Sequence, residues 1–145
     1  MKPLLLTHVA ATWWMVAVIW FVQWVHYPLF AHVGADSFSR YEAAHVSRIT
    51  PLVMIPMLIE LGTGIALALR QPSLPGVWAG VGFIAFVWLV TFFLSVPAHQ
   101  ALSTNFDGSV LRRLVATNWL RTAAWTGRGV LCVWWLSRFV EMRGS

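Results

Sequence analysis

Two long stretches of the chain, residues 3–35 and 71–106, contain no Asp, Glu, Lys or Arg. Over all 145 residues only 10% are charged and 59% are hydrophobic, and the mean hydropathy is +0.70. A water-soluble domain of this length cannot bury so much apolar surface, and soluble domains carry about 25% charged residues. The chain is therefore predicted to be an integral membrane protein.

Four segments are long and apolar enough to cross a bilayer, which takes about 20 residues of helix. The expected spans are about 5–27, 51–70, 77–98 and 118–138. Thr50 and Pro51 indicate an N-cap and a first-turn proline at the start of the second span. The prediction is one all-α domain over residues 1–145, a four-helix transmembrane bundle with up-down-up-down topology and both termini on one side.

Charge and cysteine content limit the possible classes of partner, but they do not orient the protein in the membrane. The net charge is +5, yet the basic residues are scattered along the chain, which does not favour nucleic-acid binding. Lys and Arg divide equally between the two expected sides, so the positive-inside rule does not orient the protein. The single cysteine, Cys132, excludes an internal disulfide. We expect a multi-pass protein of a bacterial inner membrane, surrounded by lipid and able to form a homo-oligomer or to join a larger membrane complex.

Two opposite charges fall inside the expected spans. Glu60 is about 13 Å into the second span and Arg128 about 15 Å into the fourth, counted from the same side. Because a charge within the membrane is costly, the two side chains are expected to pair. The pair either locks the bundle, or holds a carboxylate that relays protons or anchors a substrate.

One face of the fourth span is polar. Five residues recur there at spacings of 3, 4, 3 and 4, which places them on one stripe of a helix: Asn118, Arg121, Trp125, Arg128 and Cys132. Such a stripe must face the bundle interior or a watery cavity. Asn118, Arg121 and Arg128, together with Glu60, are therefore candidate catalytic residues that could stabilise negative charge on a substrate oxygen.

Three histidines are expected near one end of the bundle. His26 ends the first span, with Gln23 one turn deeper; His45 precedes the second span and His99 ends the third. Neutral imidazole is a common ligand for transition metals, so these four residues are candidates for binding a haem, and the three histidines for binding a single metal ion. The alternative is that the histidines are solvated at the membrane surface.

The same residues predict a cavity. We expect His26 and His99 to lie in one cavity that is covered by residues 28–50 and bounded on its inner side by Arg121 and Glu60. Such a cavity would suit a planar, weakly polar molecule that arrives from the bilayer.

Three short motifs resemble a known family. They are His26-Tyr27-Pro28, Val96-Pro97-Ala98-His99-Gln100-Ala101-Leu102 and Asn118-Trp119-Leu120-Arg121-Thr122. Together they are similar to the anthrone-oxygenase-like family, small four-helix membrane proteins mostly of unknown function. The few members with an assigned activity oxidise reduced polycyclic aromatics without an obvious bound cofactor. The resemblance implies a cavity for a flat hydrophobic aromatic molecule, polarised by Asn118 and Arg121.

A weaker resemblance concerns the bacterial four-helix protoporphyrinogen oxidase. Leu6-Thr7-His8-Val9 resembles its haem-ligating histidine segment. Its next two landmarks are resembled by Tyr27-Pro28-Leu29-Phe30 and by Thr50-Pro51 with Gly62-Thr63-Gly64. The lysine that this family carries after a tryptophan of helix three is absent after Trp78. This resemblance implies a helical frame that holds haem or a porphyrin.

These observations lead to two main hypotheses of function. The first is a membrane oxidoreductase acting on a hydrophobic aromatic or quinol-like substrate, with the histidines holding a metal or haem or acting as acid–base groups. The second is a non-catalytic small subunit of a respiratory or photosynthetic complex, which binds pigment or haem structurally or binds nothing. A proton-coupled carrier is less favoured, because no inverted repeat is visible.

Overall fold

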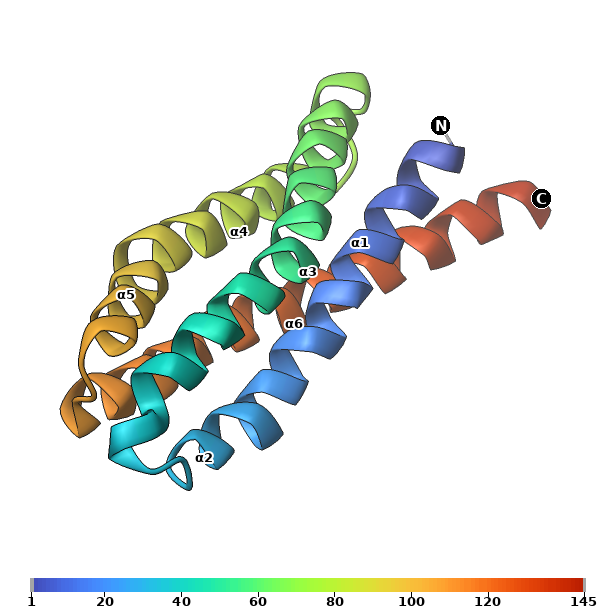
Figure 1. The fold of residues 1–145 in the computed structure, drawn as a ribbon. Helices are drawn as coiled ribbons and strands as arrows, with labels where there is room; N and C mark the ends of the chain where they lie inside the picture. Colours follow the sequence, from blue (N-terminus) through green and yellow to red (C-terminus); the bar gives the residue numbers. More distant parts are fainter. Residues whose placement is uncertain (1, 145) are drawn as a thin grey trace.

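Four long helices run back and forth along one axis in the computed structural model, which describes residues 2–144, with the backbone alone for 140–144 (Figure 1). The first is α1 (Lys2–Phe21) with the π-helical turn η1 (Val22–His26) and α2 (Tyr27–Phe30); the second is α3 (Ala35–Arg70); the third is α4 (Val77–Val90) with the π-helical turn η2 (Thr91–Ser95) and α5 (Val96–Thr104); the fourth is α6 (Gly108–Gly144). Both termini lie at one end, and the connections α2–α3 and α5–α6 lie at the other. The predicted all-α up-down-up-down bundle is confirmed.

The helices form a ring of neighbours. α1 packs on α3 and α6, and the α4–α5 helix packs on the same two. α3 and α6 therefore face each other across the bundle axis, as do the first and third helices. A side-chain contact that joins such a pair lies at the centre of the bundle.

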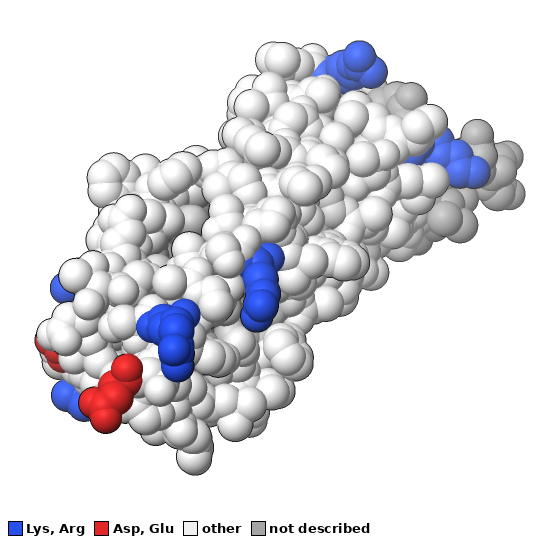
Figure 2. Space-filling model, in the orientation of Figure 1, with Lys and Arg blue, Asp and Glu red and all other residues white. Residues whose placement is uncertain are grey.

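Three of the helices, Lys2–Phe30, Ala35–Arg70 and Val77–Thr104, are long and apolar enough to cross a membrane. α6 is as long but less apolar, since Arg121 and Arg128 lie within it. These two side chains are buried in the bundle, while Trp119, Val130 and other large apolar residues of α6 are exposed. Most of the surface in Figure 2 is likewise uncharged. This inverted pattern is that of an integral membrane protein.

Pro51 was expected to begin the helix of the second span, and this prediction is wrong. The helix begins at Ala35, after the extended residue Gly34, and continues through Thr50 and Pro51. Thr50 does not cap a helix: its hydroxyl donates to the carbonyl of Val46 at 2.7 Å, the usual bond of a threonine inside a helix. α3 is therefore one unbroken helix, and residues 36–49 belong to the bundle wall.

A tryptophan compensates for a second proline in α3. Pro56 has no N–H to offer the carbonyl of Leu52, four residues earlier. The indole Nε1 of Trp14 donates to that carbonyl at 3.2 Å. The contact lets α3 pass through Pro56 unbroken and fixes α1 against it.

Two prolines produce the two π-helical turns. In each turn the residue before a proline donates its N–H to the carbonyl five residues back: Tyr27 to Val22 before Pro28, and Val96 to Thr91 before Pro97. The wider turn lets the helix continue despite the missing proline N–H. Both turns lie toward the α2–α3 end of the bundle, where they position His26, Tyr27 and Ser95.

α6 begins at a capping aspartate. Oδ1 of Asp107 accepts hydrogen bonds from the hydroxyl of Ser109 at 2.6 Å and from its N–H at 2.7 Å. These bonds, led by that from the hydroxyl, hold the pKa of Asp107 below its ordinary value. The cap fixes where the polar stripe of α6 starts.

Replacing Gly76 with alanine should destabilise the protein by about 1–2 kcal/mol, because a left-handed residue with a Cβ is strained. Gly76 has φ +76° in the α3–α4 turn, and an added Cβ would lie 2.9 Å from Cδ1 of Leu131. Gly82→Ala in α4 is the control: its Cβ would meet nothing within 4 Å, so it should be neutral or stabilising. Thermal unfolding in detergent measures both, and an equal effect would contradict the prediction.

Candidate functional site

The first of two polar clusters surrounds Glu60. Oε1 of Glu60 accepts from Nε of Arg128 and from the hydroxyl of Thr12, both at 2.7 Å, and Oε2 accepts from the indole of Trp125 at 3.1 Å. Glu60 is 2% exposed and Arg128 1%. The predicted ion pair is present, and it joins α3 to α6 across the bundle axis.

The rest of this cluster satisfies Arg128 and His8. Nη1 of Arg128 donates to the carbonyl of Gly80, and Nη2 donates to Nε2 of His8 at 3.1 Å. An arginine only donates, so Nδ1 of His8 holds the ring proton and donates to the hydroxyl of Thr63 at 2.8 Å. The Glu60 cluster (His8, Thr12, Glu60, Thr63, Trp125 and Arg128) thus favours the bundle-locking alternative. His8 has no free ring nitrogen for iron, so it does not fit the haem ligand that the weaker resemblance implies.

The second cluster gathers the three histidines at the α2–α3 end. Nε2 of His26 lies 2.9 Å from Nδ1 of His45. The ring centroid of His45 is 4.5 Å from that of His26 and 5.5 Å from that of His99. His45 stands between the other two, so His26 and His99 belong to one cluster of side chains without a direct hydrogen bond between their own rings.

His99 is the middle member of a hydrogen-bonded chain. Its Nδ1 bonds to Oε1 of Glu42, and its Nε2 lies 3.1 Å from the hydroxyl of Tyr27. A carboxylate only accepts, so Nδ1 carries a proton; in the neutral imidazole Nε2 then accepts from the hydroxyl of Tyr27. Glu42 is fully buried. We call Glu42, His99 and Tyr27 the His99 relay; it joins α3 to the first and third helices through the centre of the bundle.

Two members of the relay, Glu42 and Tyr27, were not among the site residues expected from the sequence. Phe38, Glu42, His45 and Ile49 recur at spacings of 4, 3 and 4, which is one face of a helix. The pattern lies wholly before the expected boundary at Pro51, and it indicates a face of the bundle interior only when residues 36–49 belong to the same helix as the second span.

Arg121 is buried without a carboxylate partner among the residues that the structure describes. Its Nη1 donates to the hydroxyl of Ser95 and to Oδ1 of Asn118, both at 3.3 Å, and its Nε has no hydrogen-bond partner. The guanidinium lies 5.2 Å from the ring of Trp125. Nδ2 of Asn118 in turn donates to Oε1 of Gln23 at 2.9 Å. Asn118 and Gln23 therefore orient Arg121.

A cavity of about 510 Å³ lies among the four helices at this level, and we call it the inner cavity. His99 and Tyr27 of the relay line it together with His45 and Arg121, and Met15, Met54, Met57 and several valines supply apolar walls. Two expectations need correction. Glu60 does not border this cavity, since its carboxylate is held by Arg128. His26 lines a neighbouring cavity instead.

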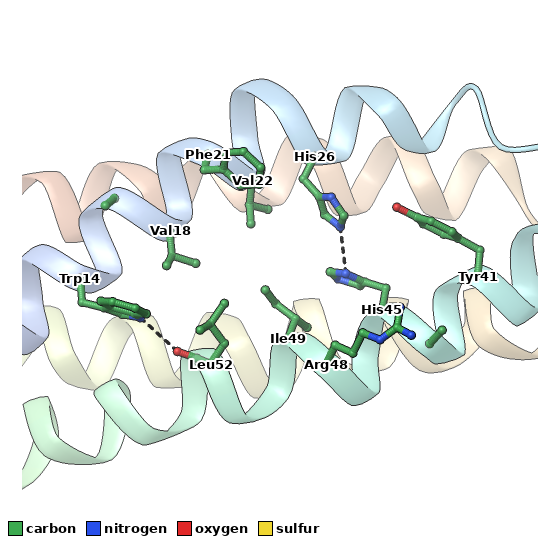
Figure 3. Close-up of a pocket in the computed structure, with 12 residues that line it drawn as sticks. Trp14, Val18, Phe21, Val22, His26, Tyr41, His45, Arg48, Ile49 and Leu52 are labelled. Carbon is green, nitrogen blue, oxygen red and sulfur yellow. Dashed lines mark hydrogen bonds between the residues drawn. The ribbon is translucent and has the colours of Figure 1, made fainter.

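That neighbouring cavity, the outer cavity, lies between α1 and α3 and has a volume of about 540 Å³ (Figure 3). Trp14 and Leu52 lie at one end, and His26, Tyr41 and Arg48 at the other. Four residues line both cavities: Val18, Val22, His45 and Ile49. The histidine cluster thus stands at the boundary between the two.

The predicted metal site is not formed. Among the described residues, no three or more His, Cys, Asp or Glu side chains are arranged to hold a metal ion. His26, His45 and His99 direct ring nitrogens at one another, at Glu42 and at Tyr27, whereas ligation needs nitrogens aimed at one point about 2 Å away. The three rings are therefore engaged in hydrogen bonds and do not direct three nitrogens at one ion.

The fold and the two clusters define a helical integral membrane protein with a buried set of acid–base groups beside a cavity. Models of protein families, curated protein sequences and solved structures include no match for this chain. The function must therefore be argued from the inner cavity itself.

Proposed function

We propose that the protein is a membrane oxidoreductase that binds a flat hydroxylated aromatic or quinol-like molecule in the inner cavity and removes its hydroxyl proton through the His99 relay. One observation supports this most directly: His99, held by a buried carboxylate, and Arg121, buried without one, line the same cavity. A base and a free positive charge are the two groups that such a deprotonation needs.

The charges of the site balance in both states of this reaction. Before proton transfer, Glu42 is negative, Arg121 is positive and His99 is neutral. Tyr27 gives its hydroxyl proton to Nε2 of His99 and takes one from the ligand hydroxyl, so the ligand becomes an oxyanion. The new imidazolium then faces Glu42, and the oxyanion faces Arg121. Because unpaired charges are costly in a dry interior, this arrangement stabilises the deprotonated ligand.

Oxidation of the deprotonated ligand also needs an electron acceptor. A quinol becomes a quinone by losing two protons and two electrons, and dioxygen, which takes up both pairs as hydrogen peroxide, would serve as the acceptor. The resemblance to the anthrone-oxygenase-like family favours the same substrate class. A bacterial inner membrane, where lipid-soluble aromatics dissolve, is the location that we propose.

The remaining polar residues have supporting roles in this scheme. Glu60 and Arg128 hold the helices together, Asn118 and Gln23 orient Arg121, and His26 fixes the ring of His45. Of the residues first expected to be catalytic, only Arg121 lines the inner cavity.

Replacing Arg121 with methionine should strongly reduce activity while leaving the fold as stable as before or more stable. The test follows oxidation of a methylnaphthoquinol and of anthrone, by absorbance and oxygen uptake, with the protein in lipid nanodiscs. Loss of the charge that stabilises the oxyanion should lower kcat by about 10²–10³-fold. The unfolding temperature should not fall, because a buried charge without a counter-ion is removed.

The matched control is Arg113→Met, an exposed arginine two turns earlier on α6, which should leave the rate unchanged. An Arg121→Met protein with full activity would overturn the proposed role of the cavity. Failure of the unmodified protein to accelerate either oxidation would overturn the enzyme proposal and favour the non-catalytic subunit.

A further inference from the structure

We infer that the ligand of the inner cavity has an alkyl or isoprenoid tail, and that the tail lies in the outer cavity between α1 and α3. The inference rests on the proposed function, because it assigns the second part of the same ligand. It narrows the substrate class from flat aromatics in general to tailed quinols.

The two cavities share part of their walls. Four side chains line both of them, namely Val18, Val22, His45 and Ile49. Three of the four are small or branched apolar residues, and His45 is the single polar one. A tail that leads from a head group beside His45 and Arg121 into the outer cavity would therefore cross a wall that is apolar except for His45.

The outer cavity is polar at one end and apolar at the other. In Figure 3 its polar residues, His26, His45, Tyr41 and Arg48, lie together at one end. Apolar side chains of Trp14, Val18 and Leu52 form the other end. This gradient matches a molecule with a polar head near the histidines and a hydrocarbon tail running toward Trp14.

The outer cavity is bordered by exposed apolar side chains of α1 and α3. Phe21 is 59% exposed, Trp14 49% and Leu52 43%, on two helices that are long and apolar enough to cross a membrane. A slot bordered by such side chains opens to lipid acyl chains rather than to water. Both volumes, about 510 and 540 Å³, fall in the range of complete ligand sites.

The test compares two binding probes with the same ring: 2-methyl-1,4-naphthoquinone, and its derivative with a decyl tail at position 3. Ala17 is exposed and lines the outer cavity, so Ala17→Phe should fill the slot. Quenching of tryptophan fluorescence in nanodiscs of one lipid composition gives each Kd. Comparing protein variants at a fixed lipid content cancels the different partitioning of the two probes into the bilayer.

Ala17→Phe should weaken binding of the tailed probe by about tenfold or more, the usual cost of overfilling a packed site. The tail-less probe should bind unchanged. Ala44→Phe places the same ring on the opposite wall of the slot, from α3, and should give the same result. Ala79→Phe, exposed on α4 and outside both cavities, should change neither affinity.

Three results would overturn the inference. An unchanged affinity for the tailed probe in both plugged variants would show that the tail leaves by another path. Equal weakening of both probes would show that the plugs act on the head group. If neither probe binds the unmodified protein, the proposed function fails and the inference fails with it; binding of the tail-less probe alone leaves the proposed function standing.

Discussion

Replacing Glu60 with leucine should lower the free energy of unfolding by about 3–5 kcal/mol, because Arg128 would remain as an uncompensated charge in the bundle centre. Arg128→Leu should lower the free energy of unfolding by a similar amount, because it leaves Glu60 buried without a counter-ion. The loss extends beyond the ion pair. Without the carboxylate, Thr12 and Trp125 lose their acceptor; without the guanidinium, His8 loses the donor that fixes its ring. Unfolding in detergent or bicelles measures both losses.

The double variant Glu60→Leu with Arg128→Leu should cost less than the two single losses added together. Residues in direct contact are coupled, whereas distant ones are additive. Asp107→Ala with Arg128→Leu is the control, since these residues are separated by roughly 30 Å along α6. Strict additivity in the Glu60 and Arg128 cycle would show that the pair does not act as one unit.

The fold and this ion pair could be predicted because both follow from counting residues along the expected helices. The two charge-free stretches require membrane helices, and hairpin connectivity then sets the order of their directions. Glu60 and Arg128 fall at the same depth when both are counted from the same membrane side. A buried stripe on α6 likewise follows from helical periodicity alone.

The His99 relay could not be predicted for two physical reasons. Pro51 is as typical of a helix start as of a membrane helix whose neighbours satisfy the freed carbonyl groups, and local sequence does not distinguish these cases. In addition, each π-helical turn adds a residue and shifts the phase of the helix. The direction of Tyr27 after η1 therefore does not follow from a period of 3.6.

The metal hypothesis shows a similar limit. The three histidines lie together near one end of the bundle, as their depths along the expected spans indicated. Whether their nitrogens point at one ion or at one another depends on side-chain rotamers and on partners such as Glu42, which depth along a helix does not determine.

Replacing His99 with glutamine should lower the rate of quinol oxidation by about 10²–10⁴-fold, the range expected when a general base is lost. Binding of the naphthoquinone product should change little, because the ring is held by the apolar walls and Arg121. The substitution thus separates proton transfer from binding. Quinone formation and quinone quenching of tryptophan fluorescence, measured on one nanodisc preparation, give the two quantities.

Glu42→Gln tests the same relay from its buried end. The amide keeps the size of the carboxylate but cannot balance an imidazolium at His99, so kcat should fall by about 10²-fold or more while the product affinity is kept. Tyr27→Phe should be milder than His99→Gln, because it removes the intermediate hydroxyl and leaves Nε2 of His99 directed at the cavity. The matched control is His32→Gln, at an exposed histidine of the α2–α3 connection, which should leave the rate of quinol oxidation unchanged. A His99→Gln protein that oxidises quinol at the normal rate would assign the relay to structure alone, since the hydrogen bonds of a glutamine can hold Tyr27 but its amide cannot take up a proton.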